Sequence, residues 1–147
     1  MPGPAAYTVP LDNPFANGPA TSLPEVYMYG LRDPWRIAFD AGPDLLYIAD
    51  VGENRLEELN VVPRSAAGSN FGWNVFEGSY CRRVDCTAAL DTTVLPVLEY
   101  SHDVGAAIIG GYVYAGERAP ALSGRFVFAD FEGFIRSVSV VGGVAGD

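Results

Sequence analysis

The sequence GLRDPWR at 30–36 places an arginine where it could bind an anion. Pro34 has no backbone N–H to donate to a strand, and it biases Asp33 toward extended backbone. We therefore expect Arg32 on a bent loop at the end of a strand. A guanidinium held there can bind a carboxylate through two parallel hydrogen bonds. The alternative is a surface arginine paired with a nearby acid.

A second candidate site follows the apolar run at 45–49. The segment DVGEN at 50–54 combines a glycine with oxygen-bearing side chains. Calcium takes roughly six to eight oxygen ligands, many of them backbone carbonyls, and a glycine lets carbonyls turn toward one point. The spacing differs from that of an EF-hand loop. The turn NFGW at 70–73 has aromatic residues, which more often pack in a core than form a binding platform.

Two cysteines, Cys81 and Cys86, enclose the segment CRRVDC, which has neither helical nor strand periodicity. A disulfide that closes this loop is the favoured interpretation, and a pair of inert thiols is the alternative. A zinc site would need more ligands, and His102, the one histidine of the chain, cannot complete a tetrahedral set. A disulfide would place the protein outside the cytoplasm.

Composition predicts an all-β chain with the length of one domain. The 147 residues are 49% hydrophobic, and 17 glycines and 11 prolines are spread along them, which fits short strands joined by turns. Residues 1–24 read as an irregular lead-in. Strands are predicted over 25–29, 36–40, 45–49, 57–62, 97–100, 111–114, 125–129 and 135–140.

The strand spacing favours the blades of a β-propeller over a sandwich or barrel. A blade takes roughly 40 to 50 residues, so the chain could supply about three, fewer than the roughly four to eight that close a ring. Open blades would leave strand edges unpaired. The chain begins without the basic region and apolar core of a signal peptide. We therefore expect 25–147 to be part of an incomplete propeller domain.

The charge of the chain excludes nucleic acid as a partner. The net charge is −9, from 18 acidic residues against nine arginines, with no lysine. Phosphate backbones and anionic membranes both demand a basic patch. No apolar run approaches the ~20 residues that a membrane-spanning helix needs, so membrane insertion is not expected.

Several motifs along the chain occur together, in order, in one known family. They are PLDNPF at 10–15, EVYMYGLRDPWR at 25–36, DVGENRLEELN at 50–60, NFGWN at 70–74, EYSH at 99–102, GGYVYAG at 110–116 and GRFVFADFEGFI at 124–135. This series resembles the soluble PQQ-dependent glucose dehydrogenases, also called the glucose/sorbosone or aldose sugar dehydrogenase family. The resemblance covers nearly the whole chain and implies the later blades of a six-bladed β-propeller.

The resemblance also implies roles for individual residues. Arg32 would contact the quinone cofactor PQQ, and Gly52 and Glu53 would offer backbone carbonyls to the calcium that activates it. Glu57 falls where the family has an acidic residue near the sugar, and Tyr100 where a tyrosine lines the substrate side. The implied activity is oxidation of an aldose sugar to its lactone, with electrons passed to a separate acceptor.

The sequence departs from the family pattern at several positions. Asp33 stands where asparagine is common, and Val51 replaces a glutamine. Asp103 and Gly105 replace a tryptophan and a threonine of the glucose enzymes. Near Phe131 those enzymes carry a cofactor-binding lysine, which this chain lacks.

The family's general base is a histidine on an earlier blade, whereas His102 follows Arg32 in the chain. We therefore expect His102 to be a polar loop residue, no catalytic residue to be assignable, and the chain alone to be inactive. One alternative is a propeller without chemistry, a binding module like the Hedgehog-interacting proteins. Another is a truncated fragment without function of its own. The resemblance implies a periplasmic or extracellular location.

Overall fold

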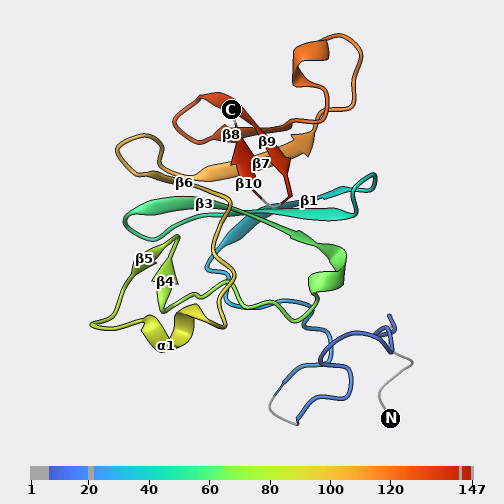
Figure 1. The fold of residues 1–147 in the computed structure, drawn as a ribbon, viewed down its shortest axis with the longest axis vertical. Coiled ribbons are helices and arrows are strands. Elements are labelled where there is room, and N and C mark those ends of the chain that lie inside the picture. The colour runs from blue at the N-terminus through green and yellow to red at the C-terminus, as the bar shows by residue number, and fades with distance from the viewer. Residues whose placement is uncertain (1–6, 20–21, 143, 147) are drawn as a thin grey trace.

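The computed structural model describes residues 7–19, 22–142 and 144–146, most of which lie in two antiparallel sheets (Figure 1). The first has the order β1-β2-β3-β6, from β1 (Pro34–Asp40), β2 (Leu45–Asp50), β3 (Leu56–Pro63) and β6 (Leu98–Ser101). The second has the order β10-β9-β8-β7, from β7 (Ile108–Val113), β8 (Phe126–Asp130), β9 (Ile135–Val141) and β10 (Val144–Gly146). The prediction of an all-β chain is confirmed.

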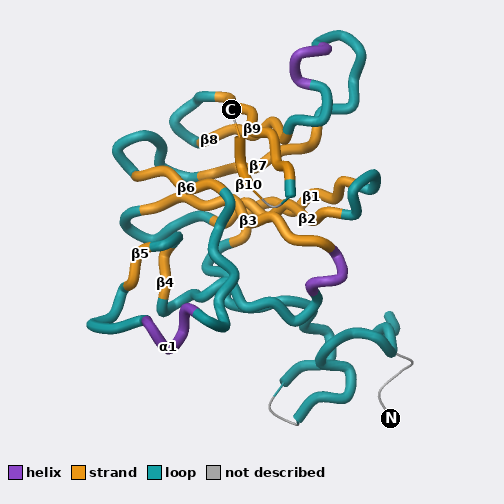
Figure 2. Tube along the Cα trace, viewed as in Figure 1, coloured by secondary structure: helices purple, strands orange, loops and turns teal. Residues whose placement is uncertain are grey.

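A long insertion separates β3 from β6. It contains a 3-10 turn at Arg64–Ala66, a hairpin of β4 (Phe76–Glu77) and β5 (Tyr80–Cys81), and the one-turn helix α1 (Thr87–Leu90). A further 3-10 turn, at Pro120–Leu122, lies between β7 and β8. Figure 2 shows how little of the chain is helical. Among the described residues, no helix is long and apolar enough to cross a membrane.

The main hydrophobic core lies between the two sheets. Its buried members are Ala38, Tyr47, Ala49, Leu59, Val61 and Tyr100 from the first sheet, and Ile108, Phe126, Phe128 and Val138 from the second. The rings of Tyr47 and Phe126 stack across this interface, with their centroids 4.7 Å apart. Such contact of sheet face on sheet face buries apolar area and stabilises the packing of the two sheets.

The other face of the first sheet carries a smaller core. Leu46, Ile48, Val62 and Phe71 are buried there, and Met28 and Leu31 pack against them. Strands β2 and β3 are thus covered on both faces, which explains their almost continuous burial.

The first strands of the two sheets, β1 and β7, lie against each other. Gly110 on β7 permits this approach, because a Cβ there would lie 3.0 Å from the Cβ of Arg36 on β1 and 2.8 Å from that of Ala49 on β2. Two successive four-stranded sheets that pack face to face, with their first strands in contact, have the arrangement of neighbouring propeller blades. Chain length alone predicted about three blades. The described residues form two, because 64–97 are used for the insertion.

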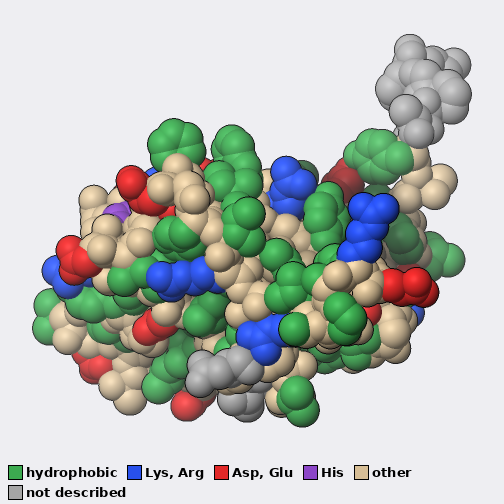
Figure 3. Space-filling model, turned by 90° about the horizontal axis from the view of Figure 1, so that it is seen from above, with side chains coloured by type: hydrophobic (Ala, Val, Ile, Leu, Met, Phe, Trp, Pro, Cys, Tyr) green, Lys and Arg blue, Asp and Glu red, His purple; other side chains and the backbone are tan. Residues whose placement is uncertain are grey.

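Both outward sheet faces expose apolar side chains. Trp35, Ile37 and Phe39 are exposed on β1, and Tyr112, Ile135 and Val141 on the second sheet. Figure 3, seen from above the second sheet, shows hydrophobic side chains spread over that surface with arginines between them. Apolar outward faces are expected where a blade of a β-propeller packs against a neighbouring blade.

The predicted strand over 25–29 is wrong. This segment has a single β-bridge, between Tyr29 and Asn70, although it follows 68–73 through several backbone hydrogen bonds. Its partner cannot extend, because Gly68 and Gly72 have positive φ angles and turn the chain. Residues 7–19 and 22–24 of the predicted lead-in form turns and coil, and 1–6 and 20–21 lie outside the described residues.

Removal of a ring from the main core should destabilise the fold. Phe126→Ala leaves a cavity beside Tyr47, and we expect it to lower the free energy of unfolding by about 3 to 5 kcal/mol. Urea unfolding followed by tryptophan fluorescence measures this loss. Val84, which is fully exposed, provides the control, and Val84→Ala should change stability by less than about 0.5 kcal/mol. Equal effects of the two substitutions would contradict the assignment of this core.

Candidate functional site

Arg32 lies on the loop before β1, as predicted from Pro34. Its backbone N–H and that of Asp33 donate to the two carboxylate oxygens of Asp50, over 2.8 and 2.7 Å. Asp50 is buried, and burial raises its pKa although the two N–H donors oppose the rise. The Arg32 guanidinium, about one-third exposed, donates to the carbonyl of Val51 over 3.1 Å. The two candidate loops are therefore held side by side.

The loop after β2 winds around one carboxylate oxygen. Oε1 of Glu77 accepts hydrogen bonds from the N–H groups of residues 53, 54, 55 and 56, over 2.9, 2.8, 2.7 and 3.2 Å. Burial favours the protonated form of Glu77, but these donors outweigh it and hold its pKa below the ordinary value. Only glycine fits at Gly52, because a Cβ there would lie 1.9 Å from the carbonyl oxygen of Leu56.

The carbonyls of Gly52 and Glu53 are free to take a ligand. Among the described residues, no hydrogen-bond donor reaches either oxygen. No group of three or more His, Cys, Asp or Glu side chains in the described ranges is placed to hold a metal ion. A cation at this loop would therefore depend on backbone oxygens.

Two arginines lie against the ring of Trp73, beside the loop after β2. The Arg82 guanidinium lies 4.2 Å from the ring centroid and that of Arg32 5.8 Å, both within cation–π range. Arg82 also pairs with the carboxylate of Glu53 and lies 3.8 Å from that of Glu77. The site thus gathers two positive charges around one aromatic ring.

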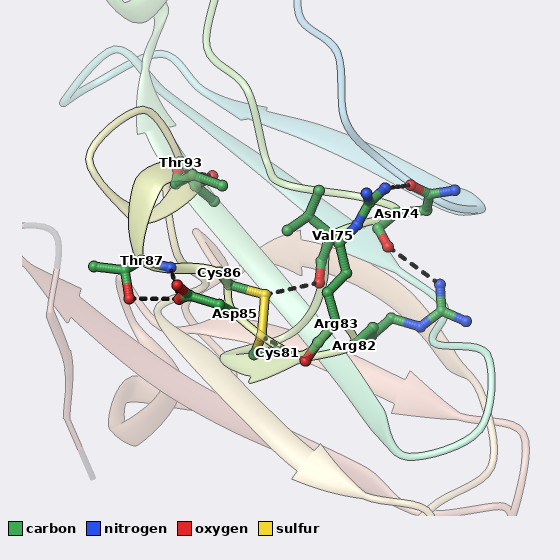
Figure 4. Close-up of a disulfide and its surroundings, with 10 residues drawn as sticks. Asn74, Val75, Cys81, Arg82, Arg83, Asp85, Cys86, Thr87 and Thr93 are labelled. Atoms are coloured by element: carbon green, nitrogen blue, oxygen red, sulfur yellow. Dashed lines mark hydrogen bonds between the residues drawn. A yellow bond between two sulfur atoms is a disulfide. The ribbon is translucent and has the colours of Figure 1, made fainter.

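Arg82 belongs to a loop closed by the predicted disulfide, which is confirmed between Cys81 and Cys86 (Figure 4). Within this loop Arg82 donates to the backbone carbonyl of Asn74, and Arg83 to the side-chain oxygen of Asn74. The disulfide and these bonds fasten the loop beside the Trp73 segment.

Three carboxylates cross the first sheet as neighbours in register. Glu58 on β3 pairs with Asp50 on β2 and with Glu99 on β6. Glu58 accepts from Gly78 N–H over 2.7 Å, and Glu99 accepts from the N–H and hydroxyl of Ser79. Burial raises the pKa of Glu58 to about 7, and the charge of Asp50 adds to the rise. The turn of the β4–β5 hairpin is thereby bound to the sheet.

The two predicted substrate-side residues point into the interior between the sheets. The side chain of Glu57 is fully buried and accepts from Ile108 N–H, and its other oxygen lies 2.8 Å from His102 Nε2. The Tyr100 hydroxyl donates to Asp130 over 2.7 Å. Burial, followed by this bond, raises the pKa of Tyr100. Both side chains are occupied by internal hydrogen bonds.

His102 nevertheless lines an open groove of about 510 Å³. The other lining residues are Asn54, Arg55, Leu56, Tyr80, Ser101 and Asp103. The guanidinium of Arg55 lies 4.2 Å from the ring centroid of Tyr80 on one wall of the groove. The 52–56 loop therefore has free carbonyls at one end and this groove at the other.

A hollow of about 620 Å³ beside Phe39 and Tyr27 contains none of the predicted site residues.

The structure brings Arg32, Gly52 and Glu53 together and separates them from Glu57 and Tyr100, which face the core. Sequence reasoning missed Glu77, Arg82 and Asp130. For Asp130 a signal was available, because it ends the apolar run 126–129 and a buried carboxylate needs partners.

The two blades define the class of protein, since successive four-stranded antiparallel sheets packed in this way form a β-propeller. The sequence profile of the family described as "Glucose / Sorbosone dehydrogenase" matches residues 5–138. The chain belongs to this family.

Relatives and solved structures agree with this assignment. HIPL1 protein of Arabidopsis thaliana is 36% identical over 140 residues, covering 86% of this chain and 20% of the relative. Human Hedgehog-interacting protein is 30% identical over 128 residues, covering 86% of this chain and 16% of the relative. The chain thus spans about a fifth of the length of these relatives.

The fold matches solved sugar dehydrogenases. A PQQ-bound aldose sugar dehydrogenase from Streptomyces coelicolor superposes with a TM-score of 0.67 at 24% identity, covering 94% of this chain and 34% of that chain. A glucose dehydrogenase gives a TM-score of 0.77 at 23% identity, covering 95% of this chain and 40% of that one. The partial coverage agrees with a section of a larger propeller.

The raised pKa of Glu58 makes its contribution to stability depend on pH. The folded protein retains a proton there that the unfolded chain loses, so this contribution falls as the pH rises from about 4.5 to about 7. Glu58→Gln removes the dependence. We expect the free energy of unfolding of the variant to rise relative to that of wild type as the pH increases, by on the order of 2 kcal/mol from about pH 5 to about pH 8. Urea unfolding across this range measures the gain, and Glu117→Gln, at an exposed position, should show none.

Proposed function

We propose that the protein carrying this chain oxidises aldose sugars to lactones with PQQ and calcium. Membership of the glucose/sorbosone dehydrogenase family supports an oxidoreductase of this kind. The likeness to a PQQ-bound aldose sugar dehydrogenase supports the cofactor. The observation that carries the proposal is the hydrogen bond from the Arg32 guanidinium to the carbonyl of Val51, which holds Arg32 beside the loop that contains the Gly52 and Glu53 carbonyls.

The residues at these loops fit both groups. Arg32 is partly exposed and donates one hydrogen bond to a described residue, so the rest of its guanidinium can bind a carboxylate of PQQ. Gly52 and Glu53 would give two oxygen ligands to calcium. When bound, the pair supplies a hydride acceptor whose carbonyl is polarised by the cation.

The remaining residues of this chain bind and orient. The groove beside the 52–56 loop, with polar side chains and the exposed ring of Tyr80, could hold part of a sugar. Nε2 of His102 is committed to buried Glu57, so we assign no proton-transfer role to His102. Electrons would leave to a separate acceptor. The disulfide supports a periplasmic or extracellular location.

A second candidate function is a binding module without chemistry. The similarity to human Hedgehog-interacting protein favours it. So does Asp33, whose exposed carboxylate lies 4.0 Å from the Arg32 guanidinium and would repel an anionic cofactor there.

Cofactor uptake distinguishes the two functions. We expect the full-length protein to bind PQQ in the presence of calcium, followed by absorbance, and to reduce a dye with aldoses. Arg32→Ala should weaken PQQ binding roughly 10- to 100-fold, because a charged hydrogen bond is lost. Arg64→Ala serves as the control, since Arg64 pairs with Asp44 at an exposed position outside these loops.

Failure of the wild-type protein to take up PQQ would contradict the enzymatic function and favour the binding module. Equal affinity of Arg32→Ala and wild type would leave the enzyme but remove Arg32 from its cofactor site.

A further inference from the structure

We propose that Glu77 is the positioning residue of the calcium loop, aiming the carbonyls of Gly52 and Glu53 toward a bound cation. This inference rests on the proposed function, which supplies the calcium. Glu77 is nearly fully buried and stands on β4, more than 20 residues beyond the loop that it binds.

The direction of the two carbonyls follows from the planar trans peptide. The N–H of Glu53 and the carbonyl of Gly52 belong to one peptide group, and they point in opposite directions. The N–H of Asn54 is related in the same way to the carbonyl of Glu53. Since Glu77 Oε1 accepts both N–H groups, at 2.9 and 2.8 Å, both carbonyls turn away from Glu77.

A charged acceptor suits this task better than a neutral one. A cation at the carbonyl oxygens and a carboxylate at the N–H groups lie at opposite ends of the same two peptide dipoles, and each strengthens the interaction of the other. The N–H bonds of residues 55 and 56 to the same oxygen close the loop behind them. Arg82 contacts the carboxylates of Glu53 and Glu77 and keeps the Glu53 side chain on that side.

The tight turn at Gly52 agrees with this role. A Cβ at Gly52 would meet the carbonyl oxygen of Leu56 and lie 3.1 Å from Glu77 Oε1. The Leu56 carbonyl thus excludes any side chain at Gly52, and the loop closes tightly beside the Glu77 carboxylate.

The test compares calcium affinity with stability. The full-length protein and its variants are titrated with CaCl₂ by isothermal calorimetry, and each unfolding midpoint is measured without calcium. We expect Glu77→Gln, which keeps the shape but loses the charge, to weaken calcium binding at least tenfold. Glu99→Gln is the matched control, because Glu99 holds Ser79 of the same hairpin and makes no bond to residues 53–56. It should bind calcium as wild type does.

A folded Glu77→Gln variant with wild-type calcium affinity would overturn the positioning role. Failure of the wild-type protein to bind calcium would instead overturn the proposed site itself. Glu77→Asp, which keeps the charge but draws the oxygens back, should also lose affinity and replaces Glu77→Gln if that variant does not fold.

The role of Glu77 can also be tested on the wild-type protein, through the NMR signal of the Glu53 amide. Labelling with ¹³C-carbonyl glycine and ¹⁵N-glutamate selects Gly-Glu peptide bonds, which in this chain are Gly52–Glu53 and Gly116–Glu117. Calcium should move the Glu53 amide proton downfield, as its bond to Glu77 strengthens, and leave Glu117 unchanged. Once calorimetry has shown that the wild-type protein binds calcium, a Glu53 signal that calcium does not move would contradict the role of Glu77.

Discussion

Hydrogen bonds from loop N–H groups to buried carboxylates fix the backbone around the candidate site. Asp50 accepts from 32 and 33, Glu77 from 53–56, Glu58 from 78, Glu57 from 108, and Asp130 from 106 and 132. Glu99, which is only partly buried, accepts from 79. A charged hydrogen bond contributes about 1.5 to 3 kcal/mol, and a buried carboxylate without partners would cost more. The carboxylates therefore hold the loops in place, and the N–H groups of the loops offset the cost of burying the carboxylates.

These bonds divide the acidic residues into two sets. Asp50, Glu58 and Glu77 hold the Arg32 loop, the hairpin and the 52–56 loop together on one side of the first sheet. Glu57 and Asp130 hold the connection between the blades. Among the described residues of this site, the carboxylates leave the Arg32 guanidinium and the backbone carbonyls of Gly52 and Glu53 available to a ligand.

Sequence patterns predicted seven of the strands, because residues 36–62 and 97–140 alternate apolar runs with clear turn signals. The motif at 30–36 was enough to place Arg32, since proline restricts the backbone locally. The role of Glu77 was not predictable, because it depends on a two-residue strand far along the chain. The inward direction of the Glu57 side chain was not predictable either. Strand β3 is buried on both faces, so the pattern of apolar residues along it does not show which face turns inward.

Amide hydrogen exchange tests the central claim, that buried carboxylates hold these loops, most directly. The N–H groups of residues 53–55 belong to a loop, yet they should exchange as slowly as the N–H of Leu56 and the others of strand β3 at neutral pH. The N–H groups of 32 and 33, held by Asp50, should behave in the same way. Exchange at these positions as fast as in the exposed turn at residues 116–118 would contradict the account.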